Sequence, residues 1–186
     1  MLLSIVFCIA TLAVSGCSPS PQPRRELPDF SLTGVTVDGV VPFDRAALRG
    51  RVWVADFIYT RCAGPCPLLT ASMAGLQKRL PRSIGLLSLT VDPEHDAPEV
   101  LALYAQRVNA DPQRWFFLTG DKAELVRLVR DGFLLPVAED AAAAPGQRVT
   151  HSSKFVLIDA DARARGWYDG DDAASLDRLA ADARKL

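Results

Sequence analysis

The feature that most restricts the fold of this chain is an apolar segment, residues 52–59, that leads directly into a pair of cysteines. The segment is rich in β-branched and aromatic residues, which is typical of a strand buried on both faces of a sheet. Cys62 and Cys66 follow it, and Pro67 suits the first turn of a helix. Beyond Pro67, one helical face carries Leu69, Met73, Leu76 and Leu80. The sequence therefore predicts a buried strand, a cysteine-bearing loop and an amphipathic helix in direct succession.

The rest of the chain alternates between strand and helix patterns, which predicts an α/β fold with a central mixed sheet flanked by helices. Two short strands, 29–34 and 35–41, are expected to form an N-terminal hairpin extension around the turn signal Asp38-Gly39. Residues 96–99 resemble a capping box that starts a helix, and the alanine-rich residues 139–147 are expected to form an exposed loop. Further strands are expected at 84–91, 115–119, 154–159 and 163–168, and further helices after Asp121 and from 173 to the end.

The beginning of the chain has the pattern of an export signal. Residues 2–14 form an apolar run that is short for a membrane span but typical of the apolar region of a secretory signal. The run ends in Val14-Ser-Gly-Cys17, which resembles the lipobox of bacterial lipoproteins, although no Lys or Arg precedes it and an uncleaved anchor is the alternative. We expect 1–16 to be a lipoprotein-type signal peptide, 17–27 a tether lipidated at Cys17, and 28–186 the folded domain, held at the cell membrane and facing the periplasm.

Charge and cysteine content narrow the possible functions. The 21 basic and 22 acidic residues are scattered and leave no basic patch, which excludes nucleic acid as a partner. Of the 4 cysteines, Cys8 lies in the expected signal and Cys17 is the expected lipidation site. Cys62 and Cys66 therefore remain alone in an exported domain, where two thiols form a disulfide, bind a metal or exchange electrons with other thiols.

The placement of the two cysteines favours metal binding or redox chemistry. Cys66 is expected at a helix N-terminus, where free N–H groups and the helix dipole favour the thiolate. Cys62 lies in the preceding loop, and Gly64 allows that loop to fold back so that the sulfurs approach each other. Two thiolates are soft ligands that suit Cu(I), and a third ligand would complete a trigonal site. His151, one of only 2 histidines, stands just before a predicted strand. In thioredoxin-like folds the loop at that place faces the cysteines, which outweighs the ordinary interpretation of a surface histidine.

Three segments together carry a resemblance to a known family. Residues 57–67 (FIYTRCAGPCP), 89–100 (LTVDPEHDAPEV) and 150–159 (THSSKFVLID) resemble the Sco/SenC family of copper-binding proteins involved in cytochrome c oxidase assembly. The resemblance covers nearly all of the chain after the tether. It implies a thioredoxin-like fold. Two positions depart from the family pattern: Ala63 stands where proline is frequent, and His95 stands where arginine is frequent.

The resemblance also implies a site. The family's copper ligands correspond to Cys62, Cys66 and His151, and copper is bound as Cu(I) or Cu(II). An acidic residue near the family's site corresponds to Asp92, which is not itself a ligand. Because Asp92 and the cysteines follow neighbouring predicted strands, we expect them at the same edge of the sheet. Asp92 either orients His151 or presents charge to a partner. The alternative interpretation is that Asp92 only starts a turn. His95 is interpreted as a solvated loop residue, with a Cys2His2 zinc site as the less favoured alternative.

Two functions follow from these residues. The first is a copper metallochaperone that delivers copper to the binuclear copper centre of cytochrome c oxidase, with an oxidase subunit as its partner and with another periplasmic copper carrier or a thioredoxin-like reductant as further candidates. The alternative is a thiol–disulfide oxidoreductase in which Cys62 and Cys66 form a redox-active pair that reduces the cysteines of a partner protein. A peroxidase of the peroxiredoxin type and an inert structural disulfide are less favoured.

Overall fold

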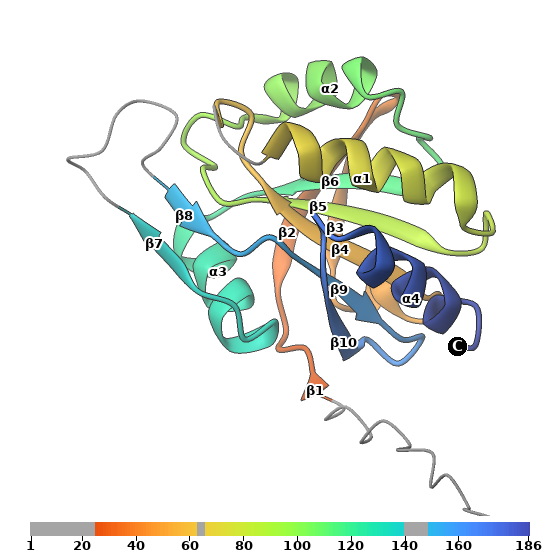
Figure 1. Ribbon diagram of the computed structural model, residues 1–186. Coiled ribbons are helices and arrows are strands. Elements are labelled where there is room, and N and C mark those ends of the chain that lie inside the picture. The colour runs from red at the N-terminus through yellow and green to blue at the C-terminus, as the bar shows by residue number, and fades with distance from the viewer. Residues whose placement is uncertain (1–24, 63–65, 140–148) are drawn as a thin grey trace, which may run out of the picture.

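A computed structural model of the chain describes residues 25–62, 66–139 and 149–186 (Figure 1). In chain order the elements are β1 (Arg25–Glu26), β2 (Ser31–Thr36), β3 (Gly39–Asp44), the 3-10 helix η1 (Ala46–Leu48), β4 (Trp53–Ile58), α1 (Cys66–Arg79), β5 (Gly85–Thr90), α2 (Pro98–Arg107), β6 (Trp115–Thr119), α3 (Lys122–Arg127), the π-helical turn η2 (Leu128–Gly132), β7 (Val137–Glu139), β8 (Val149–His151), β9 (Lys154–Ile158), β10 (Arg163–Asp169) and α4 (Ala173–Ala183).

The central sheet has eight strands in the order β1-β10-β9-β4-β5-β6-β2-β3. Strands β4, β5 and β6 are parallel, while β9 and β2 run antiparallel to β4 and β6, so the sheet is mixed as predicted. The expected hairpin is β2 and β3, joined at the Asp38-Gly39 turn. The first strand of the hairpin continues to Thr36 instead of ending at Gly34, because Val35 pairs with Phe117 of β6 and is fully buried.

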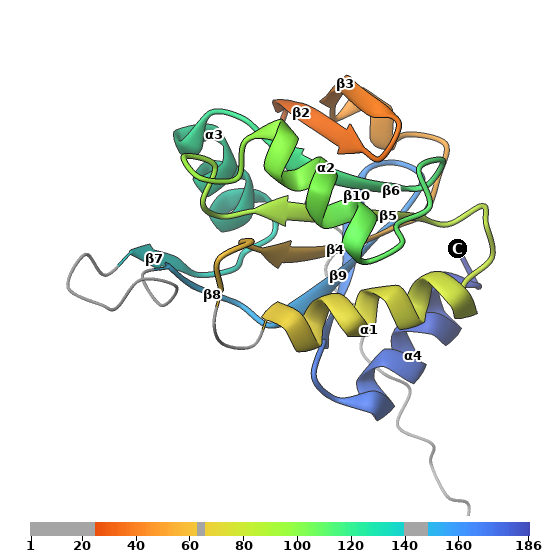
Figure 2. The same cartoon turned by 90° about the horizontal axis from the view of Figure 1, so that it is seen from above.

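Helices cover both faces of the sheet (Figure 2). One apolar core joins the sheet to α1, α2 and α4, and a second core on the other face joins it to α3 and η2. The predicted stripe of α1 is confirmed, since Leu69, Met73, Leu76 and Leu80 are all buried. Across the residues that the structure describes, no helix is long and apolar enough to cross a bilayer. The predicted signal, 1–16, lies outside those residues, and the described fold begins with β1 and the fully buried Leu27.

Two local expectations are wrong. Residues 96–99 do not form a capping box: the N-cap of α2 is Ala97, and it makes no side-chain cap. The Asp96 carboxylate is instead buried and bonded to threonines elsewhere in the chain. Glu139 does not belong to the loop expected at 139–147, because it is the last residue of β7, which pairs with β8. Residues 140–148 lie outside the described part of the chain.

One carboxyl group is buried inside the central strand β4. Asp56 is 1% exposed on the face that α1 covers, and its Oδ1 accepts a hydrogen bond of 2.6 Å from the Ser88 hydroxyl. Trp115 Nε1 donates to the same hydroxyl at 2.9 Å. The second oxygen of Asp56 has no hydrogen-bond partner among the described residues. Burial therefore raises the pKa of Asp56 to about 7, because the ionised carboxylate is poorly solvated there.

This raised pKa predicts a pH-dependent stability. Between about pH 4 and 7 the unfolded chain releases the Asp56 proton while the native chain keeps it, so the free energy of unfolding falls as the pH rises. About three pKa units correspond to roughly 4 kcal/mol. The Asp56→Asn protein lacks this ionisation, so the difference in unfolding free energy between wild type and Asp56→Asn should decline by about that amount from pH 4 to 8. Urea unfolding across this pH range measures it, and a difference independent of pH would contradict the assignment.

Candidate metal and thiol site

The two cysteines lie where the central strand gives way to the first helix. Strand β4 ends at Ile58, Cys62 is half-buried in the following loop, and Cys66 is the first residue of α1. Cys66 is only 1% exposed, because it packs into the same core as Tyr59. The two side chains are hydrogen-bonded to each other, and both cysteines are in the thiol form in this structure. The structure thus brings the predicted pair together, with one sulfur accessible and the other covered.

A buried carboxylate holds the start of the cysteine loop. Asp96 is 0% exposed and accepts hydrogen bonds from the Thr60 backbone N–H at 3.1 Å and the Thr60 hydroxyl at 2.5 Å. The Thr90 hydroxyl donates at 2.5 Å to Asp96 Oδ2, the oxygen that also accepts from the Thr60 N–H. Thr119 Oγ1 donates to the Asp96 carbonyl at 3.0 Å, which ties the next strand to the same point. The loop before Cys62 is therefore fixed to the ends of β5 and β6.

Asp92 forms a second link between the same loops. Its carboxylate pairs with Arg61 at 2.9 Å and with His95 Nδ1 at 2.9 Å. The Arg61 contact confirms that Asp92 and the cysteine loop share one edge of the sheet. His95 is 47% exposed at its side chain, as expected of a solvated loop residue. Among the described side chains no three His, Cys, Asp or Glu groups are placed to hold a metal, so neither His95 nor Asp92 completes a site with the two cysteines.

The electrostatics of Cys66 differ from the expectation for a helix N-terminus. Burial raises the pKa of the Cys66 thiol, and the hydrogen bond with Cys62 raises it further. A backbone hydrogen bond from Tyr59 lowers the pKa but does not offset these two effects. The expected thiolate at Cys66 is therefore wrong for the metal-free protein: desolvation outweighs the helix dipole. Metal binding requires the deprotonated thiol, so binding of a metal ion at Cys66 would release this proton.

The structure places the backbone of His151 at this edge of the sheet. His151 ends β8, and β9 begins three residues later at Lys154. Because β9 runs antiparallel to β4, the start of β9 lies toward the end of β4 that leads into the cysteine loop (Figure 1). A side chain at Gly170 would collide with both Phe155 of β9 and Leu69 of α1, which shows how closely these elements approach. The side chain of His151 lies outside the described part, so its distance to the sulfurs stays a prediction.

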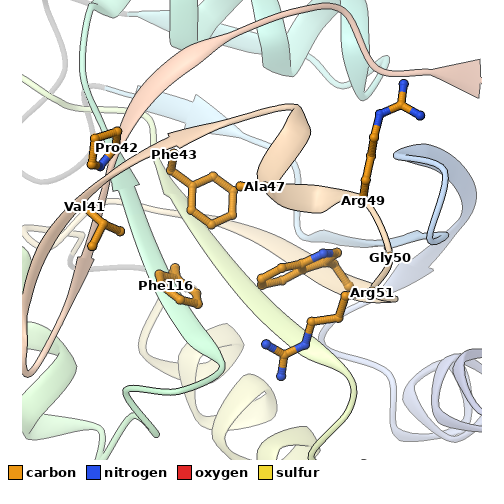
Figure 3. A pocket seen from close by; sticks show the side chains of 9 residues that line it. Val41, Pro42, Phe43, Ala47, Arg49, Gly50, Arg51 and Phe116 are labelled. Carbon is orange, nitrogen blue, oxygen red and sulfur yellow. The ribbon is translucent and has the colours of Figure 1, made fainter.

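A cavity lined by described residues lies at the other end of β4. It has a volume of about 440 Å³ and lies beside Trp53, the first residue of β4, and the aromatic rings of Phe43 and Phe116 (Figure 3). The Arg51 guanidinium lies 5.0 Å from the centre of the Trp53 ring, and its nitrogens donate to three backbone carbonyls. The Arg49 side chain extends away from the aromatic rings (Figure 3). This apolar hollow is therefore separate from the thiol chemistry.

Three residues of the site were missed in the sequence. Asp96 looked like a helix cap, and its true donor Thr60 lies 36 positions earlier. Arg61 carried no signal beyond its place next to Cys62. Tyr59 is 5% exposed and was counted as part of the apolar strand. The sequence clue to its contact with Cys62 was a hydroxyl-bearing side chain close to the cysteines in the chain.

The mixed sheet, the helices on both faces and the cysteine pair between β4 and α1 define a thioredoxin-like protein with a paired thiol site. The family model SCO1/SenC matches residues 19–186. The chain therefore belongs to the SCO1/SenC family.

Individual relatives agree with this membership. The SCO1 protein homolog of Bacillus subtilis is 33% identical over 146 residues, which is 74% of this chain and 72% of the relative. A candidate copper-binding protein of Stutzerimonas stutzeri is 30% identical over 129 residues, 67% of this chain and 61% of the relative.

Solved structures show the same likeness. The crystal structure of a SCO1/SenC family lipoprotein from Bacillus anthracis has a TM-score of 0.78 and 33% identity, covering 90% of this chain and 98% of the other. BsSco, described as a Sco-family cytochrome c oxidase assembly protein with a disulfide switch, has a TM-score of 0.72 and 31% identity, covering 88% of this chain and 94% of the other.

We expect mutation of Asp96 and mutation of Asp92 to lower the free energy of unfolding by different amounts. Asp96→Asn replaces one acceptor oxygen in a fully buried network, so we expect a loss of about 2–3 kcal/mol in the free energy of unfolding. Asp92→Asn makes the same isosteric change in an ion pair with an exposed arginine, where about 1 kcal/mol or less is expected. Urea unfolding of both variants measures the contrast, and equal losses would contradict the role assigned to Asp96.

Proposed function

We propose that this chain is a copper metallochaperone that binds one copper ion through Cys62, Cys66 and His151 and delivers it to the binuclear copper centre of cytochrome c oxidase. The observation that supports it most is the hydrogen-bonded thiol pair at the sheet edge where the backbone of His151 arrives. The donor set fits the metal, because two thiolates and an imidazole are soft to intermediate ligands suited to Cu(I). Family membership and the name of the Stutzerimonas relative point the same way.

The unequal exposure of the sulfurs suits a protein that must release its cargo. Cys66 is buried and held in the first turn of α1, so it provides a fixed ligand. Cys62 is half-buried and lies next to the exposed Arg61, so an incoming ligand from a partner meets Cys62 first. Copper transfer would then proceed by exchange at Cys62 and His151 while Cys66 retains the ion until the last step. The receiving oxidase subunit is the proposed partner, and another periplasmic copper carrier or a thioredoxin-like reductant would load or reduce the site.

Copper titration with matched variants tests this proposal. The reduced protein should bind one Cu(I), detected by native mass spectrometry, and Cys62→Ser or Cys66→Ser should abolish tight binding. His151→Ala should weaken Cu(I) affinity at least tenfold in competition with a chromogenic chelator, since even changes in outer-shell residues cost 10–100-fold. His95→Ala is the control and should leave the affinity unchanged, because His95 is paired with Asp92. Equal affinities of wild type and His151→Ala would remove His151 from the site.

The alternative function is a thiol–disulfide oxidoreductase. It is favoured by the contact between the Cys62 and Cys66 thiols and by the disulfide switch described for BsSco. In that function Cys62 would attack a partner disulfide, and Cys66 would then attack Cys62 and release the reduced partner. Turnover of a partner disulfide that persists in His151→Ala and depends on both cysteines would favour this alternative over copper delivery.

We further propose that Cys17 is lipidated and anchors the domain to the cell membrane on its periplasmic side. The pattern Val14-Ser-Gly-Cys17 and the lipoprotein described from Bacillus anthracis support it. When the full-length gene is expressed in a bacterium, the protein should incorporate labelled palmitate and sediment with membranes, and Cys17→Ser should lose the label. The matched control is Cys8→Ser, which lies in the expected signal and should keep the label. Label that persists in Cys17→Ser would contradict this assignment.

A further inference from the structure

The function proposed above leaves one polar side chain at the cysteines without a role. Tyr59 follows the last residue of β4 and is 5% exposed. Its ring belongs to the same core as Cys66, and Cys62 packs against that core. The Tyr59 hydroxyl is hydrogen-bonded to the Cys62 side chain. A phenol O–H is a much stronger hydrogen-bond donor than a thiol S–H, so the hydroxyl is the donor and the sulfur is the acceptor.

Main-chain contacts fix the same residue to both cysteines. The Cys62 backbone N–H donates to the Tyr59 carbonyl at 3.1 Å, and a backbone hydrogen bond connects Tyr59 to Cys66. The next residue, Thr60, is held by the buried Asp96. The phenol is therefore held by core packing and by the loop, and its O–H donor is aimed at Cys62 before any ligand arrives.

We propose that Tyr59 is a positioning residue whose hydroxyl donates to the Cys62 sulfur and stabilises the reduced cysteine pair relative to the disulfide. A thiolate, free or bound to a metal, is a strong acceptor, and hydrogen bonds to a charged group are about twice as strong as neutral ones. A disulfide sulfur carries no charge and accepts weakly, so the hydroxyl contributes less after oxidation. Hydrogen bonds around a ligating cysteine sulfur also tune the potential of bound copper. The part of this inference that concerns copper rests on the proposed function, and the part that concerns the thiols does not.

The test uses the equilibrium of the metal-free protein with glutathione. In that reaction the Cys62 and Cys66 thiols lose two protons and two electrons and form one S–S bond, while one glutathione disulfide becomes two molecules of glutathione. Tyr59→Phe removes only the hydroxyl, so the disulfide form should be favoured roughly three- to tenfold more than in wild type. That change equals a potential about 15–30 mV more negative.

The matched control is Tyr168→Phe. The Tyr168 hydroxyl donates to Asp182 on α4 at 3.0 Å, so this variant loses a hydroxyl bond of the same kind away from the cysteines. Its equilibrium with glutathione should equal that of wild type. An unchanged equilibrium in Tyr59→Phe, or the same shift in both variants, would overturn the proposal.

A second readout follows the Cu(II)-loaded protein. A donor on Cys62 lowers the energy of the sulfur electrons, so its loss should move the sulfur-to-copper absorption to longer wavelength in Tyr59→Phe and leave it in place in Tyr168→Phe. An absorption band that stays in place in Tyr59→Phe would contradict the contact in the metal-bound site. If the wild-type protein bound no copper, the proposed function would fail, while the shift in the metal-free equilibrium would still support the role of Tyr59.

Discussion

The arrangement of the site depends on the buried carboxylate of Asp96. It lies in the loop after β5, yet its bonds to the Thr60 backbone and hydroxyl fix the chain that follows β4. A charged acceptor that is fully buried makes strong hydrogen bonds, and it is costly to leave without donors. Two loops that are distant in sequence are therefore held as one rigid unit. Cys62 lies only two residues beyond Thr60, so its position is set by this unit and not by local turn preferences.

Burial separates the two thiols chemically. Cys66 is covered by the core of the domain, which raises the pKa of its thiol and disfavours the thiolate. Cys62 remains half-buried at the edge, where a ligand or a disulfide reaches it first. A cation or a new S–S bond removes the proton that desolvation otherwise retains. The same geometry is compatible with both metal capture and thiol exchange, the two functions that the His151→Ala variant is designed to distinguish.

Much of the fold could be predicted because the strongest signals are periodic. The apolar run at 52–59 and the apolar helix face that starts at Leu69 both indicate buried elements. The structure places β4 and α1 at these positions. The placement of Asp92 at the cysteine edge followed from the rule that parallel strands end at one edge. The role of Asp96 could not be predicted, because Asp-Ala-Pro-Glu is locally a helix-start pattern and its donors come from the loop after β4 and from the end of β5. Strand β7 was missed because it is three residues long and forms only by pairing with β8.

The polar residues of the apolar run 52–59 indicate more about the function of the protein than the apolar residues around them do. Side chains alternate along a strand, so Asp56 and Tyr59, three positions apart, face opposite sides of the sheet. Asp56 lies on the face of α1, where Ser88 and Trp115 form its hydrogen-bonded network. Tyr59 lies on the face of Phe57 and reaches Cys62. A polar group in such a strand is retained only where the fold supplies a partner or the chemistry uses it. The hydroxyl at position 59 meets the Cys62 sulfur, and the role we propose for it is therefore chemical as well as structural.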